Sequence, residues 1–203
     1  MLSCGDCRRP DTLVAFDVET ATEKYASACA LSVAVINAGG TVEERKYWLI
    51  RPPFNSYSAY NIRIHGITPR ATWNLPVFGE LWENMRPYFE RRDIVAHHAV
   101  FDVNVLAACL EAANLPPPEC SVYCSCIAAR RALSHLKSHK LPAVCQELKI
   151  PLPRHHDAAC DALACALIAH RLRGRGLLRM SWEEAKSHSF YRREFNKKNG
   201  WKF

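Results

Sequence analysis

Short apolar runs alternate with stretches of helical periodicity along this chain. The apolar runs are bounded by turn-forming residues, as buried strands are, and cover residues 12–16, 28–36, 41–50, 93–96 and 121–123. Apolar residues recur every three or four positions, as on the buried face of a helix, over residues 72–90, 101–113, 127–136, 141–148 and 158–172. Residues 54–69 show neither pattern and are predicted to be a long loop. A hairpin followed by strands that alternate with helices predicts an α/β fold with a mixed central sheet.

Two acidic residues, Asp17 and Glu19, stand at the end of the first apolar run. Because side chains alternate faces along a strand, these two share one face and lie about 7 Å apart at their Cα atoms. Two carboxylates on one face raise each other's pKa, and a divalent cation would remove that repulsion. The simpler alternative is that the strand ends here and both acids are solvated. The acidic pair alone does not distinguish a metal site from this alternative.

Two aspartates farther along the chain, Asp102 and Asp161, each lie in the first turn of a predicted helix. Asp157 is a good N-cap, so the second of these helices is expected to begin at Ala158. Asp161 then faces the sheet from one turn in, and His156 in the preceding loop is free to reach the same place. Open α/β sheets build their sites where strands end and helices begin, so we expect these side chains to converge there.

This set of residues, in this order, resembles the DEDDh (DnaQ-like) 3′–5′ exonuclease family. Residues 64–69 read Ile-His-Gly-Ile-Thr-Pro, similar to the family's Ile-His-Gly-Ile-Thr segment. Residues 94–102 read Ile-Val-Ala-His-His-Ala-Val-Phe-Asp, similar to its Val-Ala-His-Asn-x2-Phe-Asp stretch. The resemblance covers residues 12–172, includes proofreading domains of the DNA polymerase III epsilon type, and implies an RNase H-like fold.

The resemblance also implies a role for each matching residue. In the family, four carboxylates hold two Mg²⁺ or Mn²⁺ ions, and the matching residues here are Asp17, Glu19, Asp102 and Asp161. His156 matches the general base, whereas His155 is one residue too far from Asp161 to match. The positions that match the pocket for the 3′-terminal nucleotide are Thr20, His65 and Phe101, with ordinary packing as the alternative for the last two. Two positions differ from the family: His98 stands where relatives commonly carry Asn, and Ala21 where many carry Gly.

The net charge of +7 belongs to the end of the chain. From Arg171 to Phe203 there are ten Lys or Arg and three acidic residues, whereas the rest of the chain carries 17 of each sign. Interleaved aromatic residues suit this segment to attract phosphates and stack on bases, but it could equally pack on the domain. The aromatic residues in question are Phe190, Tyr191, Phe195 and Trp201. We therefore expect an N-terminal tail (1–10), an exonuclease domain (11–176) and a basic aromatic C-terminal extension (177–203).

Ten cysteines occur without a signal-peptide pattern at the N-terminus or an apolar run of about 18 residues. We therefore expect reduced thiols, a cytoplasmic location and no membrane partner. Zinc binding is a lesser alternative, because Cys4-x2-Cys7 is the one clean pair and the other spaced cysteines, Cys120, Cys124 and Cys126, do not form a second.

The sequence thus predicts a metal-dependent 3′–5′ exonuclease that releases nucleoside 5′-monophosphates from single-stranded DNA ends by two-metal hydrolysis. Such an enzyme would act alone or beside a DNA polymerase, in proofreading during DNA replication or in DNA repair. The nearest alternative is a ribonuclease of the same fold that trims RNA 3′ ends or short oligoribonucleotides, since no motif here reads the 2′ position. A non-catalytic nucleic-acid-binding module is less favoured, because such a module needs no aligned set of carboxylates and histidine.

Overall fold

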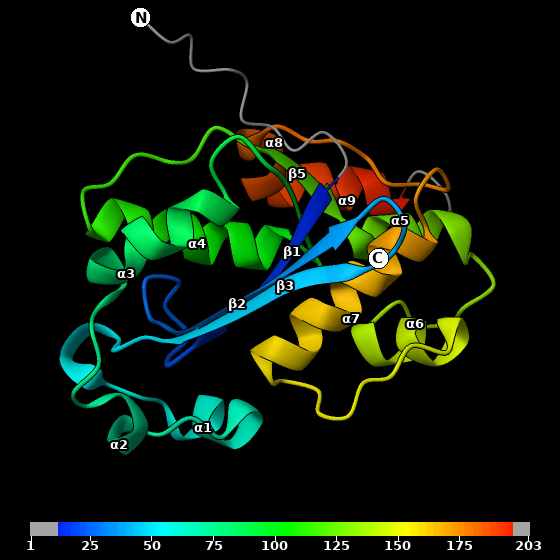
Figure 1. The fold of residues 1–203 in the computed structure, drawn as a ribbon. Helices are drawn as coiled ribbons and strands as arrows, with labels where there is room; N and C mark the ends of the chain where they lie inside the picture. Colours follow the sequence, from blue (N-terminus) through cyan, green and yellow to red (C-terminus); the bar gives the residue numbers. More distant parts are fainter. Residues whose placement is uncertain (1–11, 197–203) are drawn as a thin grey trace, which may run out of the picture.

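A five-stranded mixed sheet forms the centre of the molecule (Figure 1) in the computed structural model, which describes residues 12–196. The strands are β1 (Thr12–Thr20), β2 (Ala28–Asn37), β3 (Val42–Leu49), β4 (Asp93–Ala96) and β5 (Ser121–Cys124). Their order in the sheet is β3-β2-β1-β4-β5. β1, β2 and β3 pair antiparallel, whereas β4 and β5 run parallel to β1. This is the mixed sheet that the hydrophobic pattern predicted.

Helices cover both faces of this sheet (Figure 1). They are α1 (Ala59–His65), α2 (Pro69–Thr72), α3 (Phe78–Met85), α4 (Val100–Ala112), α5 (Ser125–Ala132), α6 (Leu141–Leu148), α7 (Ala158–Arg171), α8 (Trp182–Lys186) and α9 (His188–Asn196). Short 3₁₀ turns lie at Pro53–Asn55 and Arg86–Tyr88. α7 packs against β1 and β2 on one face, and α4 packs against the same strands on the other. β1 is therefore enclosed on both sides.

Two expectations about the segment between β3 and β4 were wrong. The one long helix expected over residues 72–90 is replaced by α3, which covers only its middle, and by the end of α2 and a 3₁₀ turn on either side. α3 ends before Pro87, because proline cannot donate a helical hydrogen bond and its ring clashes with the preceding turn. The expected loop at 54–69 contains α1, which begins where the Ser58 side chain accepts a hydrogen bond from the Tyr60 amide. α1 ends at Gly66, whose φ of 77° is the left-handed conformation that glycine adopts readily.

The described part of the C-terminal extension packs against the domain. Met180 forms an antiparallel bridge with Val122, and α8 and α9 lie against α4, β5 and α5. Tyr191 is 2% exposed within the main core, and Trp182 and Phe190 are partly buried beside it. Of the two alternatives for this segment, packing on the domain therefore applies to residues 177–193, and the boundary at residue 176 stays a prediction. The side chains of Phe195 and Trp201, like Cys4 and Cys7, lie outside the described part of the chain.

The eight described cysteines are all free thiols, and most of them are buried. Within residues 12–196, the clusters of His, Cys, Asp and Glu close enough to share a metal contain no cysteine. The described cysteines near β5 therefore belong to none of these clusters. No described helix has both the length and the apolar character that a membrane crossing requires.

Candidate active site

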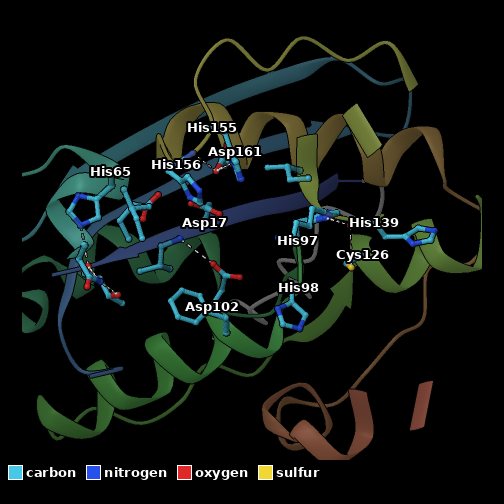
Figure 2. A pocket seen from close by; sticks show the side chains of 18 of the residues that line it. Asp17, His65, His97, His98, Asp102, Cys126, His139, His155, His156 and Asp161 are labelled. Atoms are coloured by element: carbon cyan, nitrogen blue, oxygen red, sulfur yellow. Dashed lines mark hydrogen bonds and ion pairs between the residues drawn. The ribbon is translucent and has the colours of Figure 1, made fainter. Parts of the chain in front are cut away.

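Four carboxylates line a cavity of about 1140 Å³ (Figure 2). Asp17 and Glu19 come from β1, Asp102 from the first turn of α4 and Asp161 from the first turn of α7. Each of Asp17, Glu19 and Asp161 offers a carboxylate oxygen, and these oxygens lie within 4.8 Å of one another. Asp102 completes the group and accepts a hydrogen bond from the Val18 amide at 3.2 Å. The structure thus brings together the four carboxylates that the sequence analysis selected.

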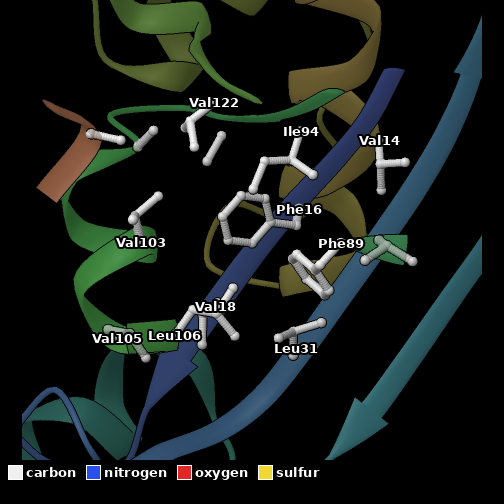
Figure 3. Packing of buried hydrophobic residues seen from close by; sticks show 14 of the residues in the cluster. Val14, Phe16, Val18, Leu31, Phe89, Ile94, Val103, Val105, Leu106 and Val122 are labelled. Carbon is white, nitrogen blue, oxygen red and sulfur yellow. The ribbon is translucent and has the colours of Figure 1, made fainter. Parts of the chain in front are cut away.

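The alternation of β1 places its two acids on the α7 face. Val14, Phe16 and Val18 point to the opposite face and pack with α4 (Figure 3). Asp17 and Glu19, which are out of phase with that apolar set, therefore face α7. The apolar residues thus fix the direction of the acidic ones.

The position of Asp161 follows from the start of α7. The Asp157 side chain accepts hydrogen bonds from the backbone amides of Ala159 and Cys160, both at 3.1 Å. This N-cap begins the helix at Ala158, as the sequence predicted. Asp161 then lies one turn into the helix and is 4% exposed, toward β1.

Burial and mutual repulsion raise the pKa values of these carboxyl groups. The pKa of Glu19 rises to about 8, first because of burial and then because of Asp161 and Asp102. Burial also raises the pKa of Asp102 to about 8, with a further contribution from Asp161. The pKa of Asp17 is raised well above its ordinary value, by burial and then by repulsion from Asp102. Ionising this group is therefore unfavourable unless a cation joins it.

The donor set fits hard divalent cations. Every ligand atom in the carboxylate group is an oxygen, which Mg²⁺ and Mn²⁺ prefer. Asp161 Oδ1 is buried and has no hydrogen-bond partner among the described residues, whereas its Oδ2 has two. A buried acceptor without a donor is unfavourable in a folded protein, and a metal ion would satisfy it.

Two adjacent histidines approach Asp161 in different ways. His155 Nδ1 donates to Asp161 Oδ2 at 3.0 Å, and the backbone amide of His156 donates to the same oxygen at 3.0 Å. His156 has a left-handed φ of 66°, and the two rings stack with centroids 3.8 Å apart. Burial, followed by the neighbouring His155, lowers the pKa of His156. The contact of His155 with Asp161 was missed by the residue count, because it depends on the left-handed turn at His156.

The residues expected to hold a terminal nucleotide lie at one end of the cavity. His65 Nε2 donates to the Thr20 carbonyl at 3.1 Å, and its Nδ1 accepts from the Ile67 amide at 3.0 Å. Both ring nitrogens of His65 are therefore occupied, Nε2 at the end of β1 and Nδ1 at the segment after α1. The ring of Phe101 is 38% exposed and lies edge-on to Tyr25 with centroids 6.0 Å apart. Phe101 thus presents an aromatic face to the cavity.

Asn61, which the sequence analysis did not select, also holds the end of β1. Its amide nitrogen donates to the Thr20 carbonyl at 2.8 Å. Asn61 belongs to α1, so the segment expected to be a loop is instead a helix that supports the site. The Ser58 and Gly66 caps were the sequence signal for it.

His98, which stands where the resembling family commonly has asparagine, has a left-handed backbone conformation. Its φ of 72° is the left-handed conformation, which Asn and His adopt more often than most residues. Its ring packs edge-on against Tyr191 of α9, with centroids 5.9 Å apart. The C-terminal extension therefore contacts a residue at the edge of the site.

The raised pKa values predict how the metal-free protein responds to pH. Glu19 and Asp102 have pKa values of about 8 when folded, so the folded chain binds more protons than the unfolded chain up to that pH. Stability should therefore fall as the pH rises through this range. His97, whose pKa burial lowers to about 4, acts in the opposite direction, but only below about pH 6.5. In EDTA, we expect the melting temperature to fall between pH 6.5 and 8, and Mg²⁺ to reduce the fall; a flat or rising profile would contradict the assignment.

Comparison with known proteins places this geometry in context. A family model described as an exonuclease (RNase_T) matches residues 14–169. The DNA polymerase III PolC-type protein of Oceanobacillus iheyensis is 27% identical over 164 residues, which are 80% of this chain and 11% of that protein. The chain thus matches only about a tenth of the length of such relatives.

Two solved structures share the fold. Exonuclease X in complex with 5′ overhanging duplex DNA matches with a TM-score of 0.65 and 21% identity, over 80% of this chain and 91% of that one. The nuclease domain of 3′hExo, a DEDDh family member bound to rAMP, matches with a TM-score of 0.68 and 17% identity, over 84% and 96%. At such low sequence identity, these two similarities show a shared fold and no more.

Proposed function

The chain belongs to the exonuclease family, as a DnaQ-like 3′–5′ exonuclease, and from that membership we propose that it removes nucleoside 5′-monophosphates from single-stranded DNA ends. The observation that carries this proposal is the set of four carboxylates that line one cavity, with one unsatisfied oxygen, on Asp161, beside the imidazole of His156. The reaction is hydrolysis, in which water adds to the terminal phosphodiester and the 3′ oxygen of the shortened strand leaves.

Asp17, Glu19, Asp102 and Asp161 would hold two Mg²⁺ or Mn²⁺ ions in this proposal. Bound there, such ions supply an acidified water and neutralise charge on the leaving oxygen. Around them, His155 Nδ1 and the His156 amide fix the orientation of Asp161, because both donate to its Oδ2. The Val18 amide similarly orients Asp102. The chain therefore holds two of the four ligands in place before a substrate binds.

His156 is the proposed general base. Its lowered pKa keeps the imidazole neutral near pH 7, so a ring nitrogen is available to accept the proton of the attacking water. His156 lies in the loop just before α7, so its ring is outside the helix that holds Asp161. Thr20 and Phe101 would contact the terminal nucleotide, with His65 holding the Thr20 carbonyl.

DNA is the favoured substrate because the curated relatives are DNA polymerases of the PolC type. The same relatives are the reason to propose a DNA polymerase as a partner. RNA is the second candidate, since one structural neighbour contains rAMP and no described residue is shown to read a 2′-hydroxyl.

The test uses 5′-labelled DNA and RNA strands of one sequence, incubated with Mg²⁺ or with EDTA. We expect the DNA to shorten stepwise from its 3′ end, faster than the RNA, and EDTA to stop the reaction. A 3′-labelled copy should lose its label in the first step, as a nucleoside 5′-monophosphate that chromatography identifies. If the protein binds the strands without shortening them, it is a non-catalytic module. If it shortens RNA faster than DNA, the ribonuclease alternative is correct.

A further inference from the structure

The cavity extends well beyond the place proposed for a terminal nucleotide. Its volume of about 1140 Å³ exceeds the ~300–1,000 Å³ typical of sites that take one small molecule. Figure 2 shows His65 at one end, His139 at the opposite end, and Asp17 and Asp102 between them. A strand with its last nucleotide beside His65 and its scissile phosphate over the carboxylates can then continue along the cavity toward His139.

The wall at that opposite end is basic. It is formed by residues 133–140, the segment between α5 and α6, which we call the lysine loop. Lys137 and Lys140 are exposed and line the cavity, and Arg130 of α5 lines it beside them. The lysine loop contains no acidic residue, whereas the acids that line the cavity come from β1, α4, α7 and the segment after β1. The cavity is thus acidic in the middle and basic at one end.

Partly buried hydrogen bonds hold the lysine loop in place. His97 Nε2 donates to the His139 carbonyl at 2.9 Å, and His139 Nε2 donates to the Leu133 carbonyl at 2.9 Å. The Ser125 hydroxyl lies 2.8 Å from His97 Nδ1 and donates to it, since that nitrogen is the acceptor of the neutral ring. The loop is therefore fastened to the ends of β4 and β5, so its lysines are presented from a fixed backbone.

We propose that Lys137 and Lys140 bind backbone phosphates of the substrate strand on the 5′ side of the scissile bond. Phosphates are the only charges that a strand of any sequence presents at regular intervals, and lysines at the edge of a groove match them without reading bases. The preferred substrate is then a strand several nucleotides long, rather than a dinucleotide or a mononucleotide ester. This inference rests on the proposed function, because it needs the strand to end at the carboxylates.

The test compares two substrates of the same enzyme. One is the p-nitrophenyl ester of thymidine 5′-monophosphate, which has no upstream phosphate, and the other is a twelve-residue oligothymidylate. In the double variant Lys137→Ala/Lys140→Ala, we expect the ratio of kcat/KM for the oligonucleotide to kcat/KM for the ester to fall about tenfold at low salt. Loss of two phosphate contacts should also reduce the log–log salt slope for the oligonucleotide by about 1.4, at about 0.7 for each contact.

A matched control removes two positive charges elsewhere. Arg70 and Arg86 are exposed and do not line the cavity, so Arg70→Ala/Arg86→Ala should keep the wild-type ratio and salt slope. An unchanged ratio in the lysine variant, or equal losses on both substrates, would overturn the inference while the exonuclease function stands. A wild-type protein that hydrolyses neither substrate would overturn the proposed function and this inference with it.

Discussion

Replacing Asp17 or Asp161 by alanine is expected to reduce the exonuclease rate more than about 10²-fold. Both side chains belong to the group of oxygens within 4.8 Å of one another, so each loss removes a ligand from the proposed metal site. The rate should be measured in saturating Mg²⁺, so that weaker binding of the metal cannot account for the whole loss. Retention of more than about a tenth of the wild-type rate would show that the site is assigned to the wrong residues.

The same variants should remain folded. Burial and repulsion raise the pKa of Asp17 well above its ordinary value, so removing this carboxylate relieves an unfavourable interaction in the metal-free protein. We expect the melting temperature of Asp17→Ala in EDTA to be no lower than that of the wild type. Glu23→Ala is the matched control, because Glu23 is exposed and lines the same cavity but lies outside the carboxylate group. It should retain wild-type activity.

Replacing His156 by alanine should lower kcat by about 10²–10⁴, the usual contribution of a general base. Metal affinity should change little, because the contact of His156 with Asp161 is made by its backbone amide, which alanine retains. The pH–rate profile of this variant should also lose its limb near neutrality. An unchanged profile would count against the assignment of the base.

His155→Ala provides the comparison within the same turn. His155 does not match the general base in the sequence, and in the structure its Nδ1 supports Asp161 Oδ2. We expect this variant to need more Mg²⁺ for full activity but to keep kcat within about tenfold of the wild type. Equal losses of kcat in the two histidine variants would mean that the roles assigned to them are wrong.

Most of the sheet could be predicted from the sequence because its signals are local. Apolar residues at alternate positions of β1 determine which face Asp17 and Glu19 occupy, and the Asp157 cap determines where α7 begins. These two local signals bring Asp17, Glu19 and Asp161 to one place. They do not place Asp102 of α4, which was expected to join the set because of the resemblance to the exonuclease family.

The features that the sequence analysis missed depend on contacts between distant segments. α1 is short and has no buried residue, so apart from its two caps it leaves little pattern in the sequence. Its importance lies in Asn61 and His65, which both bond to the Thr20 carbonyl. The lysine loop is fixed by His97, 42 residues earlier than the His139 carbonyl that it holds. The contact of Tyr191 with His98 joins α9 to the turn after β4. No periodic pattern within a short window reports such pairings.

The bridge between Met180 and Val122 bears on how the protein can be shortened for laboratory production. β5 is the outer strand of the sheet, and the Val122 amide and carbonyl both bond to Met180, at 3.0 and 2.8 Å. A version that stopped at residue 169, where the family match ends, would uncover this edge and empty the space that Tyr191 fills. Bare outer strands pair with other chains and aggregate. A soluble recombinant nuclease should therefore keep the residues through α9, although the family match does not extend to them.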